Sequence, residues 1–239
     1  MPTMTTERVL WPIIGPPPDC LNNGDRLTRA EFHELYEKSP PGTRAELIGG
    51  IVHMASPVKL LHSDYHAPMT GLLSYYQSRT KGVKTSDNVT VVLSDDSEVQ
   101  PDVCLRILAD GSPLPSRSRS TNYLHEPPEL VIEVSDSSRN VDLNAKRVTY
   151  ENHGVQEYLV LNLRDARLHA FDFANASSLE LTEGVYHSKC FPGLWIDVGA
   201  LFEEELEHLY ATLQLGLASP EHAEFVLHLE ARRAAHAKA

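Results

Sequence analysis

The amino-acid sequence predicts an α/β fold in which a mixed central β-sheet is flanked by helices. Short runs rich in β-branched residues alternate with segments of helical periodicity along the 239 residues. One run, ELVIEVS at residues 129–135, is nearly continuous in apolar residues, which is typical of a strand covered on both faces. With 41% hydrophobic and 23% charged residues, the chain has the composition of a globular protein with a sizeable core.

The chain is acidic, with 33 Asp and Glu residues against 21 Lys and Arg residues and a formal net charge of -12. Such a protein is not a general binder of polyanions, so contact with nucleic acid would need a local basic patch or metal ions. Three widely spaced cysteines, Cys20, Cys104 and Cys190, argue against a disulfide framework or a cysteine zinc site. The sequence shows no secretion signal and no apolar stretch of membrane-spanning length, so a cytoplasmic location and no membrane partner are expected.

The first part of the chain predicts an irregular arm, a helix and a hairpin. Residues 1–26 are rich in Pro, Gly and Asn and predict the arm. Thr28 followed by Glu31 has the spacing of a capping box at the start of a helix. Two short apolar runs then flank Gly49-Gly50, a two-residue hairpin signal.

The middle of the chain predicts one helix and three strands. Residues 62–80 carry apolar side chains at helical spacing, and the composition of residues 109–128 predicts a loop. The expected strands are VTVVLS at 89–94, PDVCLRI at 101–107 and ELVIEVS at 129–135.

The remaining elements complete the mixed sheet and end in helices. A helix is expected over 142–153, with Asp142 as its N-cap and Gly154 as its stop. The alternating runs 156–163 and 167–173 predict a hairpin, followed by strands at 178–183 and 194–198 and then a helix over 200–214 and a second one from Pro220. We expect three parts: an arm at 1–26, the α/β domain at 27–198 and a helical extension at 199–239.

Glu133, in the middle of LVIEV, is the first candidate for a functional side chain. Strand alternation places it on the same face as Val131 and Ser135. Either this face is turned to water, or the carboxylate is covered and needs a metal ion or a lysine beside it. The apolar Val131 on the same face favours the second alternative.

Two more carboxylates and one lysine stand in comparable positions. Asp102 follows Pro101 at the start of an expected strand, although Pro-Asp alone is more often a turn. Glu46 lies in the first strand of the hairpin, where a surface position would be ordinary. Lys146 lies four residues after Asp142, hence on the same helical face, although most helix lysines are solvated.

Taken in order, these residues resemble the PD-(D/E)xK nuclease superfamily with its restriction-endonuclease-like fold. The pattern is more similar to the Uma-type branch of that superfamily, over about residues 28–173. The pieces that carry the resemblance are AELIGGIVHMAS, the following His62, VQPDVCLRI, PPELVIEVSDSSRNVDLNAKRVTYENHGVQEYLVLN and RLHAFDF.

The sequence departs from the superfamily in two places. The general pattern has a lysine two residues after the glutamate, where this chain has Ser135, and the Uma-type pattern has a lysine on the next helix instead, which maps to Lys146. The family also usually has an acidic residue before the hairpin glycine, at the position of Gly49 here.

The resemblance implies a Mg²⁺- or Mn²⁺-dependent endonuclease that hydrolyses phosphodiester bonds in DNA. Asp102 and Glu133 would bind the metal, Glu46 would be a third acidic group, and Lys146 would orient the attacking water or stabilise the transition state. A homodimer is expected, since nucleases that cut both strands are commonly dimers. The alternative is a catalytically inactive protein of the same fold that serves as a binding or assembly module.

Several other residues are weaker candidates for the site. His62 and His66 could form a metal pair on a helix, but packing is the more common role for such histidines. Tyr150, four residues beyond Lys146, could line the site or pack in the core. Arg117 and Arg119 could contact a phosphate backbone or be exposed in their loop.

Overall fold

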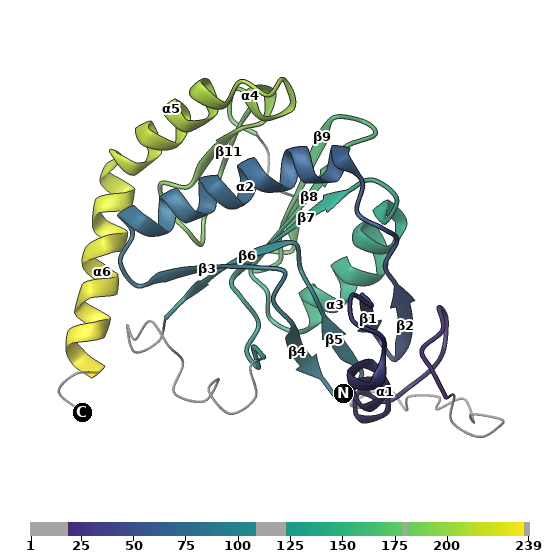
Figure 1. Ribbon diagram of the computed structural model, residues 1–239. Coiled ribbons are helices and arrows are strands. Elements are labelled where there is room, and N and C mark those ends of the chain that lie inside the picture. Colours follow the sequence, from purple (N-terminus) through teal and green to yellow (C-terminus); the bar gives the residue numbers. More distant parts are fainter. Residues whose placement is uncertain (1–18, 109–122, 179–180, 237–239) are drawn as a thin grey trace, which may run out of the picture.

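The computed structural model describes residues 19–108, 123–178 and 181–236. Arg117 and Arg119, most of the expected N-terminal arm and part of the expected strand 178–183 lie outside the described residues. The predicted α/β architecture with a mixed central sheet is confirmed (Figure 1). None of the helices in the described ranges combines the length and the apolar character that crossing a membrane requires.

The central sheet has six strands in the order β10-β9-β8-β7-β6-β3. Strands β7 and β8 run parallel, while the other neighbouring pairs are antiparallel, so the sheet is mixed. The register pairs Glu133 with Val160 and Val103 with Ile132. The bounds are β3 Val83–Asp87, β6 Val103–Ile107, β7 Leu130–Ser135, β8 Glu157–Asn162, β9 Arg167–Asp172 and β10 Ser177–Ser178.

Both faces of this sheet are covered, as the apolar run at residues 129–135 predicts. Leu130 and Ile132 on one face of β7 pack in a core with the long helix α2 (Leu60–Arg79). Val131 on the other face packs in a second core with Tyr150 from α3 (Arg147–Asn152). Figure 1 shows α2 lying across one face of the sheet, with α3 near the other.

A second, four-stranded sheet has the order β2-β1-β5-β4 and carries the predicted hairpin. Strands β1 and β2 are antiparallel around Gly49 and Gly50, whose φ angles of 57° and 79° favour glycine. Helix α1 (Arg29–Lys38) packs beside β1, and its predicted capping box between Thr28 and Glu31 is present. The strand bounds are β1 Ala45–Ile48, β2 Ile51–Met54, β4 Val91–Ser94 and β5 Ser97–Val99.

The C-terminal elements pack on the same core as α2. Leu209, Leu213 and Leu229 are buried in that core. The bounds are β11 Val185–His187, β12 Trp195–Asp197, α4 Val198–Phe202, α5 Leu206–Leu217 and α6 Pro220–His236.

Several details differ from the sequence-based expectations. The helix expected over 200–214 is two helices, α4 and α5, because the chain turns at Glu203–Glu205 with Glu204 at a φ of 58°. Strands β3, β5 and β11 were not predicted, because their sequences, VKTSD, SEV and VYH, are short and partly polar. Of the strand expected over 178–183, the described residues 181–183 lie in no strand. The N-cap role of Asp142 is wrong: the helical segment begins earlier, as a π-helix over Val141–Lys146, and Asp142 lies within it, buried.

Candidate active site

A pocket of about 300 Å³ lies where the two sheets meet the start of α2 and the end of β7. Its walls include Glu46 from β1, His62 from α2, Glu133 from β7 and Lys146 from the π-helix. Asp102, directly before β6, also lines it. The four charged residues singled out in the sequence, with His62, therefore come together in one pocket.

Lys146 is the centre of this cluster. Its Nζ atom lies 2.9 Å from Glu133 Oε1, 3.0 Å from Glu46 Oε2 and 3.9 Å from Asp142 Oδ1. The ammonium group is almost completely buried, with 6% of the side chain exposed. The neighbouring carboxylates keep a buried lysine of this kind charged. Its ammonium group therefore presents a positive charge to any group that binds in the pocket.

The helix that carries Lys146 explains how the lysine reaches the strand. Residues Val141–Lys146 form a π-helix that continues directly into α3. Lys146 and Asp142 are four residues apart and face the same interior, and Ser138 donates a hydrogen bond to Asp142. Irregular helical turns of this type occur often at functional sites.

Asp102 is held beside Glu133 by the backbone and by two histidines. The Val134 N–H donates to Asp102 Oδ2 at 2.8 Å, and His62 Nε2 lies 3.1 Å from the same oxygen. His66 Nε2 lies 3.1 Å from the Asp102 backbone carbonyl and 2.9 Å from Asp87 Oδ1. The two histidines of the HxxxH pair thus both contact Asp102, which fits the positioning of this residue better than a metal pair of their own.

The electrostatics of the cluster follow from burial and from Lys146. Burial raises the pKa of Glu133 well above its usual range, and burial also raises the pKa values of Glu46 and Asp142, with Lys146 opposing each shift. Burial alone would lower the pKa of Lys146, but Glu133 and Glu46 outweigh it and raise the pKa. The cluster therefore favours added positive charge.

Asp102 differs from the other carboxylates of the cluster. Burial would raise its pKa, but the hydrogen bond and charge of His62 outweigh burial and hold the pKa of Asp102 below its usual range. The same hydrogen bond raises the pKa of His62. Asp102 is thus an ionised carboxylate at the wall of the pocket.

Tyr150 belongs to the site and to the core at once. Its hydroxyl donates to Glu133 Oε1 at 3.0 Å, and its ring is fully buried against Tyr158. We expect Tyr150→Phe to lower the free energy of unfolding by about 1.5–3 kcal/mol, because a buried carboxylate loses a hydrogen-bond donor. Urea unfolding measures this change; an unaltered midpoint would mean that the hydroxyl is not needed there.

Ser135 and Gly49 are the two positions at which the sequence departs from the superfamily pattern. Ser135, at the position where the general superfamily has its lysine, is completely buried at the end of β7. Gly49 sits in the hairpin turn, where its N–H donates to Ser97 Oγ at 3.1 Å. Of the two positions at which the superfamily or its Uma-type branch has a lysine, 135 and 146, only position 146 therefore has one in this chain.

Two members of the site were not predicted from the sequence. Asp142 is a fourth carboxylate, and its spacing of four residues from Lys146 was the available signal. The Gln100 backbone N–H donates to Glu46 Oε1 at 2.6 Å and fixes this carboxylate. A backbone contact of this kind leaves no sequence signal.

The donor set fits a divalent cation bound through two carboxylates. The Oδ2 atom of Asp102 and the Oε1 atom of Glu133 are engaged by protein donors, and among the described residues the other oxygens have a single long contact, 3.4 Å from the Asp102 N–H to Glu133 Oε2. No three His, Cys, Asp or Glu side chains in the described ranges form a metal site by themselves. Mg²⁺ commonly binds through one or two carboxylates and completes its shell with water and phosphate oxygens.

Comparison with known proteins places this chain in a family. A solved structure from Anabaena variabilis ATCC 29413, described as a "putative nuclease belonging to DUF820", is similar to this chain with a TM-score of 0.57 and 15% identity, covering 71% of this chain and 96% of the other. At that identity the similarity shows the fold. No curated protein matches the chain. The model of the Uma2 family, described as "Putative restriction endonuclease", matches residues 29–199, and the chain therefore belongs to the Uma2 family.

Proposed function

We propose that this protein is an endonuclease that hydrolyses phosphodiester bonds in DNA with the help of Mg²⁺ or Mn²⁺. The observation that carries the proposal is the convergence of Asp102, Glu133 and Lys146 at one pocket of a chain that belongs to the Uma2 family. The family description and the nuclease fold of the solved neighbour support the reaction class.

Asp102 and Glu133 would hold the cation through Asp102 Oδ1 and Glu133 Oε2, because protein donors already engage the other oxygen of each carboxylate. A bound divalent cation would acidify a water molecule and offset the charge of the phosphate. Lys146 would donate a hydrogen bond to the attacking water or to a phosphate oxygen in the transition state. Glu46 would fix the lysine in place, because it lies 3.0 Å from the same ammonium group.

His62 and His66 would act through Asp102. Their Nε2 atoms lie beside its carboxylate and its backbone carbonyl, so they would keep Asp102 oriented towards the cation. We expect a homodimer in the cytoplasm, since cleavage of both strands of a duplex is commonly performed by two copies of a nuclease.

The test is incubation of plasmid DNA with the purified protein and Mg²⁺ or Mn²⁺, alongside Glu133→Ala. The wild type is expected to nick or linearise the DNA, and EDTA and the variant are both expected to abolish the reaction. Equal cutting by the wild type and by Glu133→Ala would point to a contaminant and contradict the proposed site.

One observation favours a second candidate function. Lys146 pairs with both Glu133 and Glu46, as the cation of a structural ion-pair network would. A catalytically inactive module that binds a partner through the same pocket would keep this network. Absence of cleavage together with retained DNA binding would favour this candidate.

A further inference from the structure

Asp136, three residues beyond Glu133, lies between two cations at the edge of the pocket. Its Oδ2 atom lies 2.7 Å from Lys59 Nζ, and its Oδ1 atom lies 3.3 Å from Arg164 Nε. Only 15% of the Asp136 side chain is exposed, whereas 59% of Lys59 and 59% of Arg164 is exposed. The carboxylate is thus largely covered by two cations that themselves face solvent.

The two cations come from separate elements that fix their positions. Lys59 is the N-cap residue of α2, at the helix end where Lys59 and His62 line the pocket. Arg164 lies in the turn between β8 and β9, where its backbone N–H donates to the buried Asn162 side chain at 3.2 Å. Asp136 itself lines the pocket together with Glu133.

The chemistry of this arrangement is that of an anion clamp. Each cation contacts a different oxygen of one carboxylate, as two cations would contact the two non-bridging oxygens of a phosphodiester. The hydrogen bond from Lys59 lowers the pKa of Asp136, so the occupant is an anion. Two cations that bind the Asp136 carboxylate at the pocket edge can bind a phosphate instead when the Asp136 side chain changes its rotamer.

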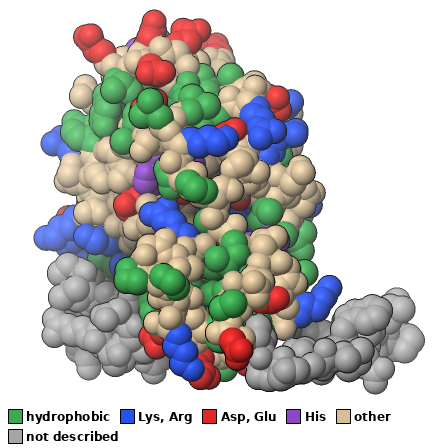
Figure 2. All heavy atoms as spheres, turned by 45° about the vertical axis from the view of Figure 1, so that its right-hand side comes forward, with side chains coloured by type: hydrophobic (Ala, Val, Ile, Leu, Met, Phe, Trp, Pro, Cys, Tyr) green, Lys and Arg blue, Asp and Glu red, His purple; other side chains and the backbone are tan. Residues whose placement is uncertain are grey.

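Further cations lie near the clamp, in a pocket whose lining carries more carboxylates than cations. Arg44 lines the same pocket, which gives its mouth cations in an acidic protein. In Figure 2, Lys and Arg side chains are spread over the middle of the face, and Asp and Glu side chains gather towards its upper and lower ends. Individual cations placed to contact phosphates are the local feature that an acidic chain would need to bind nucleic acid.

We propose that Lys59 and Arg164 form a binding subsite for a backbone phosphate of the DNA substrate, and that Asp136 occupies this subsite as a built-in competitor until DNA displaces it. The subsite rests on the proposed nuclease function, because it would hold a phosphate next to the one at Asp102 and Glu133. Competition from Asp136 would weaken the binding of isolated phosphates. Longer DNA strands, which contact the pocket at several points, would still bind tightly.

The test measures binding of a fluorescent DNA duplex in EDTA, where no metal-dependent cleavage takes place, by anisotropy at several salt concentrations. We expect Asp136→Asn to bind about three- to fivefold more tightly than the wild type. We expect Lys59→Ala and Arg164→Ala to bind more weakly and to reduce the slope of log K against log salt by about one each. In the Asp136→Asn, Lys59→Ala double variant, the gain from Asp136→Asn is expected to shrink.

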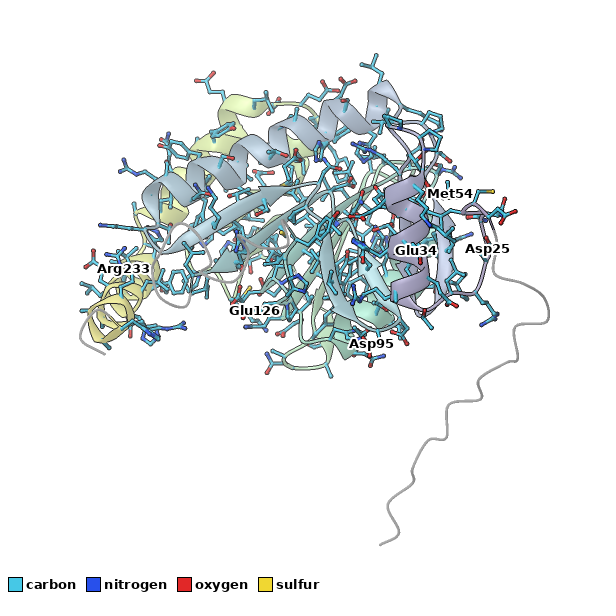
Figure 3. The ribbon with its side chains drawn as sticks, turned by 60° about the horizontal axis from the view of Figure 1, so that its bottom comes forward. Asp25, Glu34, Met54, Asp95, Glu126 and Arg233 are labelled. Carbon is cyan, nitrogen blue, oxygen red and sulfur yellow. The ribbon has the colours of Figure 1, made fainter. Side chains whose placement is uncertain are left out.

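The matched control is Glu34→Gln, which also removes one acid from a lysine. Glu34 pairs with Lys38 at 2.6 Å on α1, both side chains are more than half exposed, and neither lines the pocket. Figure 3 shows Glu34 on this helix, at the opposite end of the molecule from Arg233. Its binding is expected to match the wild type, which separates the clamp from the general effect of net charge.

Three results would overturn the clamp. Asp136→Asn could bind DNA no better than Glu34→Gln, Lys59→Ala could leave the salt slope unchanged, or Asp136→Asn could bind more weakly with a lowered melting temperature, which would make Asp136 a structural support. These outcomes are distinct from failure of the active site, because that failure is read from cleavage by Glu133→Ala and not from DNA binding in EDTA.

Discussion

Lys146→Met is expected to lower the free energy of unfolding by about 3–5 kcal/mol and to abolish DNA cleavage. The substitution keeps much of the apolar side chain but removes the ammonium group that contacts Glu133 and Glu46 in the interior. The buried carboxylates then lose their compensating charge, which is among the most costly changes in a protein interior. Chemical denaturation measures the first effect and the plasmid assay measures the second.

The stability loss in Lys146→Met is expected to depend on pH. Burial raises the pKa of Glu133 above its unfolded value even with Lys146 present, and the variant removes the opposing charge. A carboxyl group with a raised folded pKa stabilises the fold below its unfolded pKa and loses this effect as the pH rises through the folded pKa. The variant should therefore be more stable at about pH 5 than at about pH 8.

The matched control for this experiment is Lys38→Met on α1. Lys38 and Glu34 form an ion pair of 2.6 Å, but 66% and 68% of their side chains are exposed. An exposed pair of this kind contributes little to stability, so the control should unfold close to the wild type. Equal losses in Lys146→Met and Lys38→Met would contradict the buried network around Glu133.

Asp102→Asn is expected to reduce Mg²⁺-dependent cleavage by more than about 100-fold, with a smaller effect on folding. The substitution keeps the shape of the side chain but removes the negative charge that would bind the cation, while an amide can still pair with His62. His62→Gln should reduce the cleavage rate by about 10- to 100-fold, because His62 is proposed to act through Asp102. Calorimetric titration with Mn²⁺ tests the cause directly, since both variants should bind the metal more weakly.

Asp95→Asn is the control, because it makes the same chemical change at an exposed position outside the pocket lining. Figure 3 labels Asp95. Its Mn²⁺ affinity and its cleavage rate are expected to equal those of the wild type. Unchanged metal affinity in Asp102→Asn would contradict the assignment of Asp102 as a ligand, whatever happens to the cleavage rate.

Much of the fold could be predicted from the sequence because the relevant patterns are local. Alternation in β7 placed Leu130 and Ile132 on one face and Val131 and Glu133 on the other, and the two cores divide in this way. The burial of Glu133 followed from the same pattern, because an apolar neighbour on its face indicates a covered surface. The capping box of α1 and the hairpin at Gly49-Gly50 are also local signals.

The rest depends on contacts between distant segments. Strand β5 has only three residues and is defined by its pairing with β1 and β4, which no short sequence pattern shows. Asp142 satisfied the rule for an N-cap, but tertiary packing started the helical segment earlier and turned this carboxylate towards Lys146. The ion pair between Lys59 and Asp136 joins residues that are far apart in the sequence, so no local pattern indicates it.

The π-helix over Val141–Lys146 makes the position of the ammonium group sensitive to the length of the chain. A wide turn of this kind is equivalent to one residue added to an ordinary helix. Deletion of one residue there would restore regular winding and leave the flanking turns close to their present orientation, so the change would fall on the side chains of this segment. A single codon lost from this segment would therefore shift the acid at 142 or the amine at 146 relative to the pocket and leave the downstream helix intact, a short mutational route by which the proposed site could be lost without loss of the fold.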